Sequence, residues 1–264
     1  MTTELSNLII SLLYMVLTSV LATFARKLVK KTIENEFVQE LFNEAIASAE
    51  LCACCFELII VADNYGVSSY AICLFILTIW WANQWENATA CPYTHLEDVV
   101  NGTTTLRVAI FKIWAQLTGG CLVFRYIQLL WSLELASTHA GRAYEDCTAD
   151  LQVPMIFGAI VECAATCLCR LGSNVISDNL SNTKVAVVLD SFVGTSLVVA
   201  AFNYSGGYFN PVLATALKYG CAGNTFTEHM VVYWFGAIAG SIASIYIYQS
   251  SIVKQLLGQK SKIE

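Results

Sequence analysis

The amino-acid sequence predicts an all-α membrane protein built from two related halves. Of the 264 residues, 56% are hydrophobic and only 13% are charged, so the chain cannot cover a water-facing surface with polar groups. Apolar runs near the length that a helix needs to cross a bilayer, about 20 residues, recur along the whole sequence. In addition, two proline motifs and two carboxylates recur at matching distances.

Seven apolar runs are candidates for membrane spans. They lie near residues 5–25, 43–62, 69–85, 108–131, 153–171, 184–202 and 229–249. We expect all of them to be helical, because lipid leaves backbone groups no outside partner and the alternating pattern of a barrel is not visible. The first run lacks an evident cleavage site, so we expect an additional retained span; the alternative is a signal anchor that packs loosely or is dispensable.

Lysine and arginine indicate the orientation. With seven alternating spans, most of the basic residues fall on one side, which the positive-inside rule makes cytoplasmic. These residues are Arg26, Lys27, Lys30, Lys31, Arg107, Arg170, Lys184, Lys254, Lys260 and Lys262. The N-terminus is then outside or lumenal and the C-terminus cytoplasmic. Lys260 and Lys262 also resemble a dilysine signal for retrieval to the endoplasmic reticulum, although basic tails are common in membrane proteins.

The proline motifs mark an internal repeat. Cys91-Pro92-Tyr93 lies in the first half and Asn210-Pro211-Val212 in the second. Glu44 precedes the first motif by 47 residues and Glu162 precedes the second by 48. Such a spaced repeat is typical of membrane transport proteins made from two related halves.

The segments after the two motifs are too short to span. Proline is favoured in the first turn of a helix, and asparagine before it is a good N-cap. We therefore expect two half-helices that enter from opposite faces, with N-termini that meet near the midplane. Two such N-termini, each with about half a positive charge, oppose cations, while exposed carbonyls offer hydrogen bonds to neutral solutes.

Carboxylates at membrane depth need partners. We expect Glu44 and Glu162 to brace the loops before the half-helices through backbone N–H groups. Glu50 and Glu57 share one helix face, and Lys112 or Arg125 are candidate partners for them.

Most cysteines fall inside apolar runs, where they act as small hydrophobic residues. Cys163, Cys167 and Cys169 lack nearby histidines, so no metal site is expected. Cys147 and Cys221 fall on the side that is oxidising in an endomembrane protein and could bond to each other. We expect no cofactor, and no basic stripe suggests nucleic acid.

Several motifs, taken in order over residues 40–250, resemble the aquaporin superfamily. They are Glu44, Cys91-Pro92-Tyr93, Gln116-Leu117-Thr118-Gly119, Glu162, the run 203–211, and Tyr233-Trp234-Phe235-Gly236 with Gly240. The altered first motif, the additional span and Cys221 resemble the unorthodox branch, the superaquaporins. The resemblance implies six spans plus two re-entrant half-helices, a lipid bilayer as surroundings and usually a homotetramer.

Departures from the family pattern concern the pore. The family has Asn-Pro-Ala as its first motif, and Cys91 replaces the asparagine that donates its amide to the pore; a neighbour such as Thr89 could replace that donor. The family's filter arginine falls on Leu213 and its filter histidine on Val198. The other two filter positions fall on Gly207 and near Ala71. The resemblance thus implies an apolar filter without a fixed cation.

The sequence therefore predicts three parts: residues 1–32, the extra span with a basic linker; 33–139, the first channel half; and 140–264, the second half with the tail. The expected function is a passive channel for water or small neutral solutes, such as glycerol or hydrogen peroxide, in an intracellular membrane. The alternatives are a non-conducting structural or tethering protein and a coupled transporter. No enzyme is expected, because His95, His139 and His229 are scattered.

Overall fold

The computed structural model describes residues 2–256, which form helices and loops and no β-strand. The long helices are α1 (Thr2–Thr32), α2 (Glu36–Gln84), α4 (Leu106–Ser132), α5 (Met155–Asn179) and α6 (Thr183–Ser205). A last long helix is continuous through α8 (Phe226–His229), the π-helical segment η3 (Met230–Gly236) and α9 (Ala237–Gln249). The short elements are α3 (Pro92–Val100), η1 (Ser137–His139), η2 (Arg142–Tyr144), α7 (Pro211–Lys218) and α10 (Ser251–Leu256).

Helix α2 is two spans joined at Gly66. This glycine has φ 80° and ψ 167°, a conformation that only glycine adopts readily. Six helices are long and apolar enough to cross a membrane within the described residues. With α2 counted as two spans, the predicted set of seven is confirmed.

The two halves cross their helices in the same way. A Cβ atom added to Gly119 of α4 would lie 1.9 Å from the Ala45 carbonyl oxygen of α2. In the second half, a Cβ on Gly240 of α9 would lie 2.1 Å from the Cys163 carbonyl oxygen of α5. Each contact lies one residue after the carboxylate Glu44 or Glu162, so glycine lets both helix pairs approach closely beside the two carboxylates.

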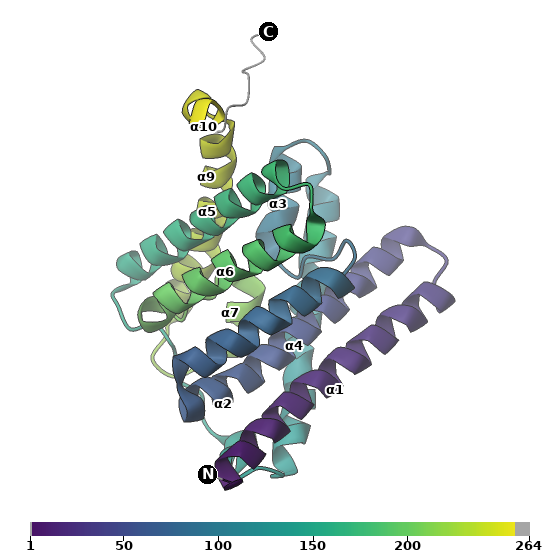
Figure 1. Ribbon diagram of the computed structural model, residues 1–264, viewed down its shortest axis with the longest axis vertical. Helices are drawn as coiled ribbons and strands as arrows, with labels where there is room; N and C mark the ends of the chain where they lie inside the picture. Colours follow the sequence, from purple (N-terminus) through teal and green to yellow (C-terminus); the bar gives the residue numbers. More distant parts are fainter. Residues whose placement is uncertain (1, 257–264) are drawn as a thin grey trace.

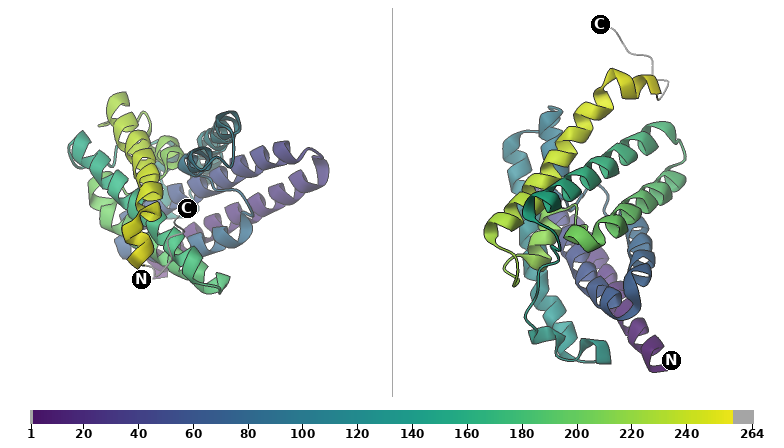
Figure 2. Two further views of the ribbon diagram at one scale, coloured as in Figure 1. Left: turned by 90° about the horizontal axis from the view of Figure 1, so that it is seen from above. Right: turned by 90° about the vertical axis from the view of Figure 1, so that its left-hand side faces the viewer.

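The additional helix α1 runs antiparallel to the first part of α2 and lies beside it in every view (Figures 1 and 2). Arg26 donates to the buried Glu50 carboxylate at 2.7 Å, and Trp85 Nε1 donates to the same oxygen at 3.0 Å. Near the middle of α1, Tyr14 donates to the Leu130 carbonyl at 3.1 Å. Helix α1 is thus bound to the bundle by specific polar contacts as well as by packing.

The partners expected for Glu50 and Glu57 were wrong. Glu57 accepts from Trp131 Nε1 at 2.8 Å and lies 2.7 Å from His139 Nε2. Lys112 instead pairs with Glu40, and Arg125 donates to Gln128. The basic partners, Arg26 and His139, lie in α1 and in the connection after α4, and a linear pattern does not reveal how these segments pack against α2.

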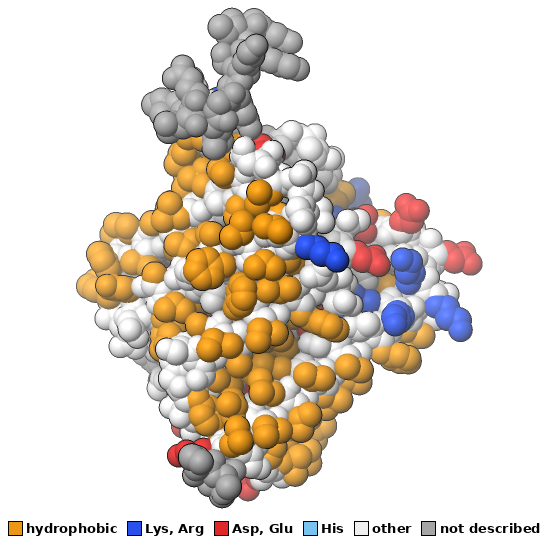
Figure 3. All heavy atoms as spheres, viewed as in Figure 1, with side chains coloured by type: hydrophobic (Ala, Val, Ile, Leu, Met, Phe, Trp, Pro, Cys, Tyr) orange, Lys and Arg blue, Asp and Glu red, His pale blue; other side chains and the backbone are white. Residues whose placement is uncertain are grey.

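The outer surface of the long helices is apolar, as a lipid-facing surface must be. Large hydrophobic side chains are exposed on α1, α4, α5 and α6, among them Leu13, Leu122, Ile160 and Phe192. In Figure 3, hydrophobic side chains cover most of one face, while lysine and arginine gather near the turn between α1 and α2. We call the end where α1 begins the lower end and the end where α9 finishes the upper end, as drawn in Figure 1.

Candidate functional site

The two half-helices, α3 and α7, start against each other at the centre of the bundle. Proline is the first residue of each, and the preceding Cys91 and Asn210 are the N-caps. Asn210 Oδ1 accepts from Val212 N at 3.0 Å, whereas the side chain of Cys91 makes no capping bond. Asn210 Nδ2 crosses to the other motif and donates to the Ala90 carbonyl at 2.7 Å.

The corresponding contact from the first motif to the second is weaker, because Cys91 Sγ lies 4.0 Å from the Phe209 carbonyl oxygen. Ala90 and Phe209, the residues just before the two caps, both have a left-handed backbone, with φ of 51° and 48°. Such a conformation is strained for residues other than glycine and needs support from its surroundings.

Glu162 supplies that support in the second half. Its fully buried carboxylate accepts from Tyr208 N at 3.2 Å, Phe209 N at 2.8 Å and Ser205 Oγ at 2.6 Å. These bonds pair backbone N–H groups that a half-helix entry leaves without helical partners.

Glu44 occupies the equivalent position in the first half. It accepts from Thr89 N at 3.1 Å, Ala90 N at 3.0 Å and Gln116 Nε2 at 2.8 Å. His95 Nε2 of α3 lies 3.1 Å from it, so this carboxylate has a basic neighbour that Glu162 lacks among the described residues.

The Thr89 hydroxyl, suggested as a replacement donor, is engaged by other protein groups. It lies 2.7 Å from Thr94 Oγ1 of α3 and 3.4 Å from the Cys91 carbonyl oxygen, and it accepts from Gln116 Nε2 of α4 at 3.4 Å.

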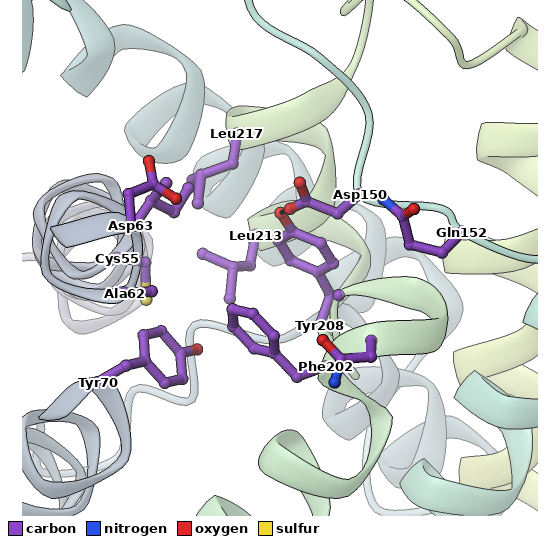
Figure 4. A pocket seen from close by; sticks show the side chains of 14 residues that line it. Cys55, Ala62, Asp63, Tyr70, Asp150, Gln152, Phe202, Tyr208, Leu213 and Leu217 are labelled. Atoms are coloured by element: carbon purple, nitrogen blue, oxygen red, sulfur yellow. Dashed lines mark hydrogen bonds between the residues drawn. The ribbon is translucent and has the colours of Figure 1, made fainter. Parts of the chain in front are cut away.

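A cavity of about 340 Å³ opens at the lower side of the motifs (Figure 4). It is lined by Cys55, Ile59, Ala62, Asp63, Tyr70, Asp150, Gln152, Phe202, Asn203, Gly206, Gly207, Tyr208, Leu213 and Leu217. Leu213 and Gly207 each stand three residues from Asn210 in sequence, so the cavity reaches to about one helical turn from the meeting point of the half-helices.

Two of the four filter candidates, Gly207 and Leu213, line this cavity, whereas Ala71 and Val198 do not. A Cβ on Gly207 would lie 2.6 Å from the Val198 carbonyl oxygen, so the loop rests directly on the Val198 backbone. Phe202, one helical turn later, lines the cavity instead. In the same way Tyr70, and not Ala71, lines the cavity, because the side chains of neighbouring helix residues point about 100° apart.

The carboxylates of the cavity are each paired with a cation. Asp63 forms an ion pair with Arg142. Asp150 lies 2.8 Å from Lys218 Nζ and accepts from Tyr208 Oη at 2.5 Å. The lining of the cavity therefore holds no unpaired carboxylate, and within residues 2–256 it includes no lysine or arginine.

A disulfide joins Cys147 to Cys221 beside this cavity. Next to it, Ala149 N donates to the Ala222 carbonyl at 2.9 Å, and Ala222 N donates to the Cys147 carbonyl at 3.0 Å. These bonds fasten the segment that carries Asp150 to the loop after α7, so the disulfide stabilises one wall of the cavity.

Sequence reasoning missed a partly buried ion pair on the upper side. Arg170 of α5 makes two bonds to the Glu97 carboxylate of α3, at 2.8 and 2.6 Å, and Ser241 Oγ of α9 donates to it at 2.5 Å. The guanidinium also lies 5.9 Å from the centre of the Tyr93 ring. The pair ties the first half-helix to the second half of the chain; a charged residue inside a half-helix was the available signal.

Comparison with known proteins identifies the family. Aquaporin-11 of Milnesium tardigradum is 30% identical over 241 residues, which cover 91% of this chain and 87% of that protein. The chain belongs to the aquaporin family. Aquaporin-12 of Mus musculus is 24% identical over 256 residues, which cover 94% of this chain and 88% of that protein. No family model matches the chain.

The solved structure of the aquaglyceroporin from Plasmodium falciparum shares the fold. It aligns with a TM-score of 0.63 at 12% identity and covers 84% of this chain and 99% of that one. The fold class and the resemblance to the unorthodox aquaporins are thereby confirmed. Aquaporins are membrane channels, and this chain is a multi-pass membrane protein of that family.

Proposed function

We propose that this chain is a passive channel for water and small neutral solutes. The observation that carries the proposal is the meeting of the two half-helices, where Asn210 Nδ2 donates to Ala90 O at 2.7 Å beside an open cavity. The N-termini of α3 and α7 direct partial positive charge to this point, which disfavours cations and proton transfer along a file of water.

The cavity supports a neutral solute. Its two carboxylates, Asp63 and Asp150, are held by Arg142 and Lys218, so no unpaired charge attracts an ion. Leu213 occupies the position at which the pattern of water-selective family members has arginine. A solute that is larger and less polar than water therefore meets an apolar wall there. Glycerol and hydrogen peroxide fit that description, and the fold neighbour is called an aquaglyceroporin.

An intracellular membrane is the proposed location, with the upper end cytoplasmic. The disulfide of Cys147 and Cys221 fits an oxidising lumen at the lower end. Basic residues near the turn between α1 and α2, among them Lys30 and Lys31 in the last turn of α1, fit the positive-inside rule. The dilysine pair, Lys260 and Lys262, lies outside the described residues. A homotetramer is proposed on the family's pattern alone.

One observation favours a second candidate, a non-conducting structural protein of the endomembrane. Cys91 replaces one central donor with a weak one, and the amide of the other, Asn210, is bonded to protein instead of facing a solute. Because an amide nitrogen carries two N–H groups, one of them is still free to serve a solute, and we give preference to the channel.

Stopped-flow light scattering on proteoliposomes tests the proposal. Liposomes with the purified protein should shrink faster than empty ones under sucrose and should then re-swell quickly under glycerol. The Asn210→Asp variant, which removes the amide donor, is expected to lose most of the flux. Rates equal to those of empty liposomes, with the protein shown to be folded and inserted, would rule out water and glycerol and favour the structural candidate.

A further inference from the structure

Two aromatic side chains meet at the floor of the lower cavity. Tyr70, from the second part of α2, and Phe202, from α6, have ring centroids 5.2 Å apart at an interplanar angle of 63°. Figure 4 shows the Tyr70 hydroxyl directed across the cavity toward Phe202, with Leu213 beside the phenylalanine ring. The pair connects two helices that come from different halves of the chain.

The backbone geometry fixes this pair in position. Tyr70 lies one helical turn after the break at Gly66, so the backbone conformation of Gly66 determines in which direction the Tyr70 side chain points. Phe202 lies in the last turn of α6, just before Gly206 and Gly207, which both have positive φ. Because Gly207 packs on the Val198 backbone, Phe202 is the residue of that helix face that borders the open space.

The surroundings of the pair are mostly apolar. Leu213 from α7 and Cys55 and Ile59 from the first part of α2 line the same cavity. Within residues 2–256 the Tyr70 hydroxyl has no hydrogen-bond partner, so it is a free donor and acceptor at this apolar position. A solute that passes here meets two rings, one hydroxyl and aliphatic side chains.

We propose that Tyr70 and Phe202, together with Leu213, form the constriction that selects solutes in this channel, in place of the positions Ala71 and Val198 that the family pattern indicates. The inference rests on the proposed channel function and deepens it. The rings limit the width of a permeating polyol, and the Tyr70 hydroxyl gives such a solute one hydrogen bond.

Full-length variants in proteoliposomes test the constriction by the ratio of xylitol to water permeability. Phe202→Ala and Tyr70→Ala should raise this ratio about tenfold, the scale on which apolar pockets discriminate by size. The matched control is Val198→Ala, one turn away on the same helix, which should keep the xylitol cut-off of the unchanged protein. Tyr70→Phe keeps the ring but removes the hydroxyl, so it should leave the size limit in place and lower xylitol permeability.

Chemical labelling separates failure of the constriction from failure of the channel. In a Cys55→Ser background, the Phe202→Cys variant should react with a small methanethiosulfonate reagent while the Val198→Cys variant is protected, as read by mass spectrometry. If solutes pass but Val198→Ala widens the cut-off and Phe202→Ala does not, the inference is wrong and the channel function stands. If nothing passes in any variant, the channel function fails. Labelling of the Val198→Cys variant rather than the Phe202→Cys variant would overturn the inference as well.

Discussion

Arg26 of the additional helix and Glu50 of the first channel helix form a buried ion pair, 2.7 Å from Nη1 to Oε2, with the glutamate side chain fully buried. Trp85, at the end of α2 and the start of the loop to Cys91, donates to the same oxygen at 3.0 Å. One carboxylate thus links α1, the bundle core and the first pore loop. The extra span is therefore part of the bundle, because its Arg26 supplies the cation that the buried Glu50 carboxylate needs. A loosely packed, dispensable anchor would not make this contact.

Arg26→Gln should destabilise the protein strongly, because a buried carboxylate would lose its cation, at a cost of about 3–5 kcal/mol. The measurement is the thermal unfolding midpoint in detergent, followed by intrinsic tryptophan fluorescence. Glu50→Gln in the same chain should restore part of the loss, since two neutral amides tolerate burial better than one charge.

Lys30→Gln is the matched control for that cycle. Lys30 lies on the same helix and pairs with Glu86 at 3.5 Å, but both side chains are exposed, 72% and 66%. Exposed pairs contribute about 0–1 kcal/mol, so this variant should melt near the unchanged protein. An equal decrease in the unfolding midpoint of Lys30→Gln and Arg26→Gln would show that the overall charge of α1, and not the buried pair, determines the stability.

Glu162→Gln should weaken the second pore loop. An amide has only one acceptor oxygen, so it cannot accept from Ser205, Tyr208 and Phe209 as the carboxylate does. A buried N–H group left without a partner costs about 1–3 kcal/mol. We expect a lower unfolding midpoint and a loss of flux; unchanged flux would mean that the loop holds its left-handed backbone at Phe209 without this brace.

The bundle and its repeat were predictable from the sequence because they depend on local patterns. Apolar length identifies a span, and proline after a capping residue identifies a half-helix. The partners of Glu50 and Glu57 were not predictable, since Arg26 and His139 reach them through helix packing. Of the filter positions that the family pattern indicates, Gly207 and Leu213 line the cavity, whereas the Val198 backbone lies under the loop at Gly207 and Phe202 of the same helix lines the cavity.

Gly240→Ala should be severely destabilising, as should Gly119→Ala. The added methyl group would overlap the neighbouring backbone, 2.1 Å from the Cys163 carbonyl oxygen and 1.9 Å from that of Ala45. Gly194→Ala is the control, because its methyl group would meet only the Cys169 sulfur at 3.9 Å. Expression and monodispersity by fluorescence-detected gel filtration should separate the first two variants from the third.

Loss of the disulfide should loosen the lower cavity wall. Cys147→Ser with Cys221→Ser removes a cross-link over a sequence separation of 74 residues, and such cross-links typically contribute about 2–4 kcal/mol. The double variant, and the unchanged protein under dithiothreitol, should melt at the same lower temperature. A midpoint that does not respond to dithiothreitol would indicate that the two thiols are not bonded in the membrane.

Cys55 should be the site at which thiol reagents block the channel. It lines the cavity at the level of Tyr70 and Leu213, while the other free cysteines of the described chain are absent from this lining. A mercurial bound to its sulfur would fill the space between α2 and α7, so water flux into proteoliposomes should fall to the level of empty vesicles and return with excess thiol. Cys55→Ser should conduct normally and resist the reagent, whereas Cys121→Ser, a control on the outer face of α4, should stay sensitive. Block that persists in Cys55→Ser would move the target to Cys91, the thiol at the meeting point of the half-helices.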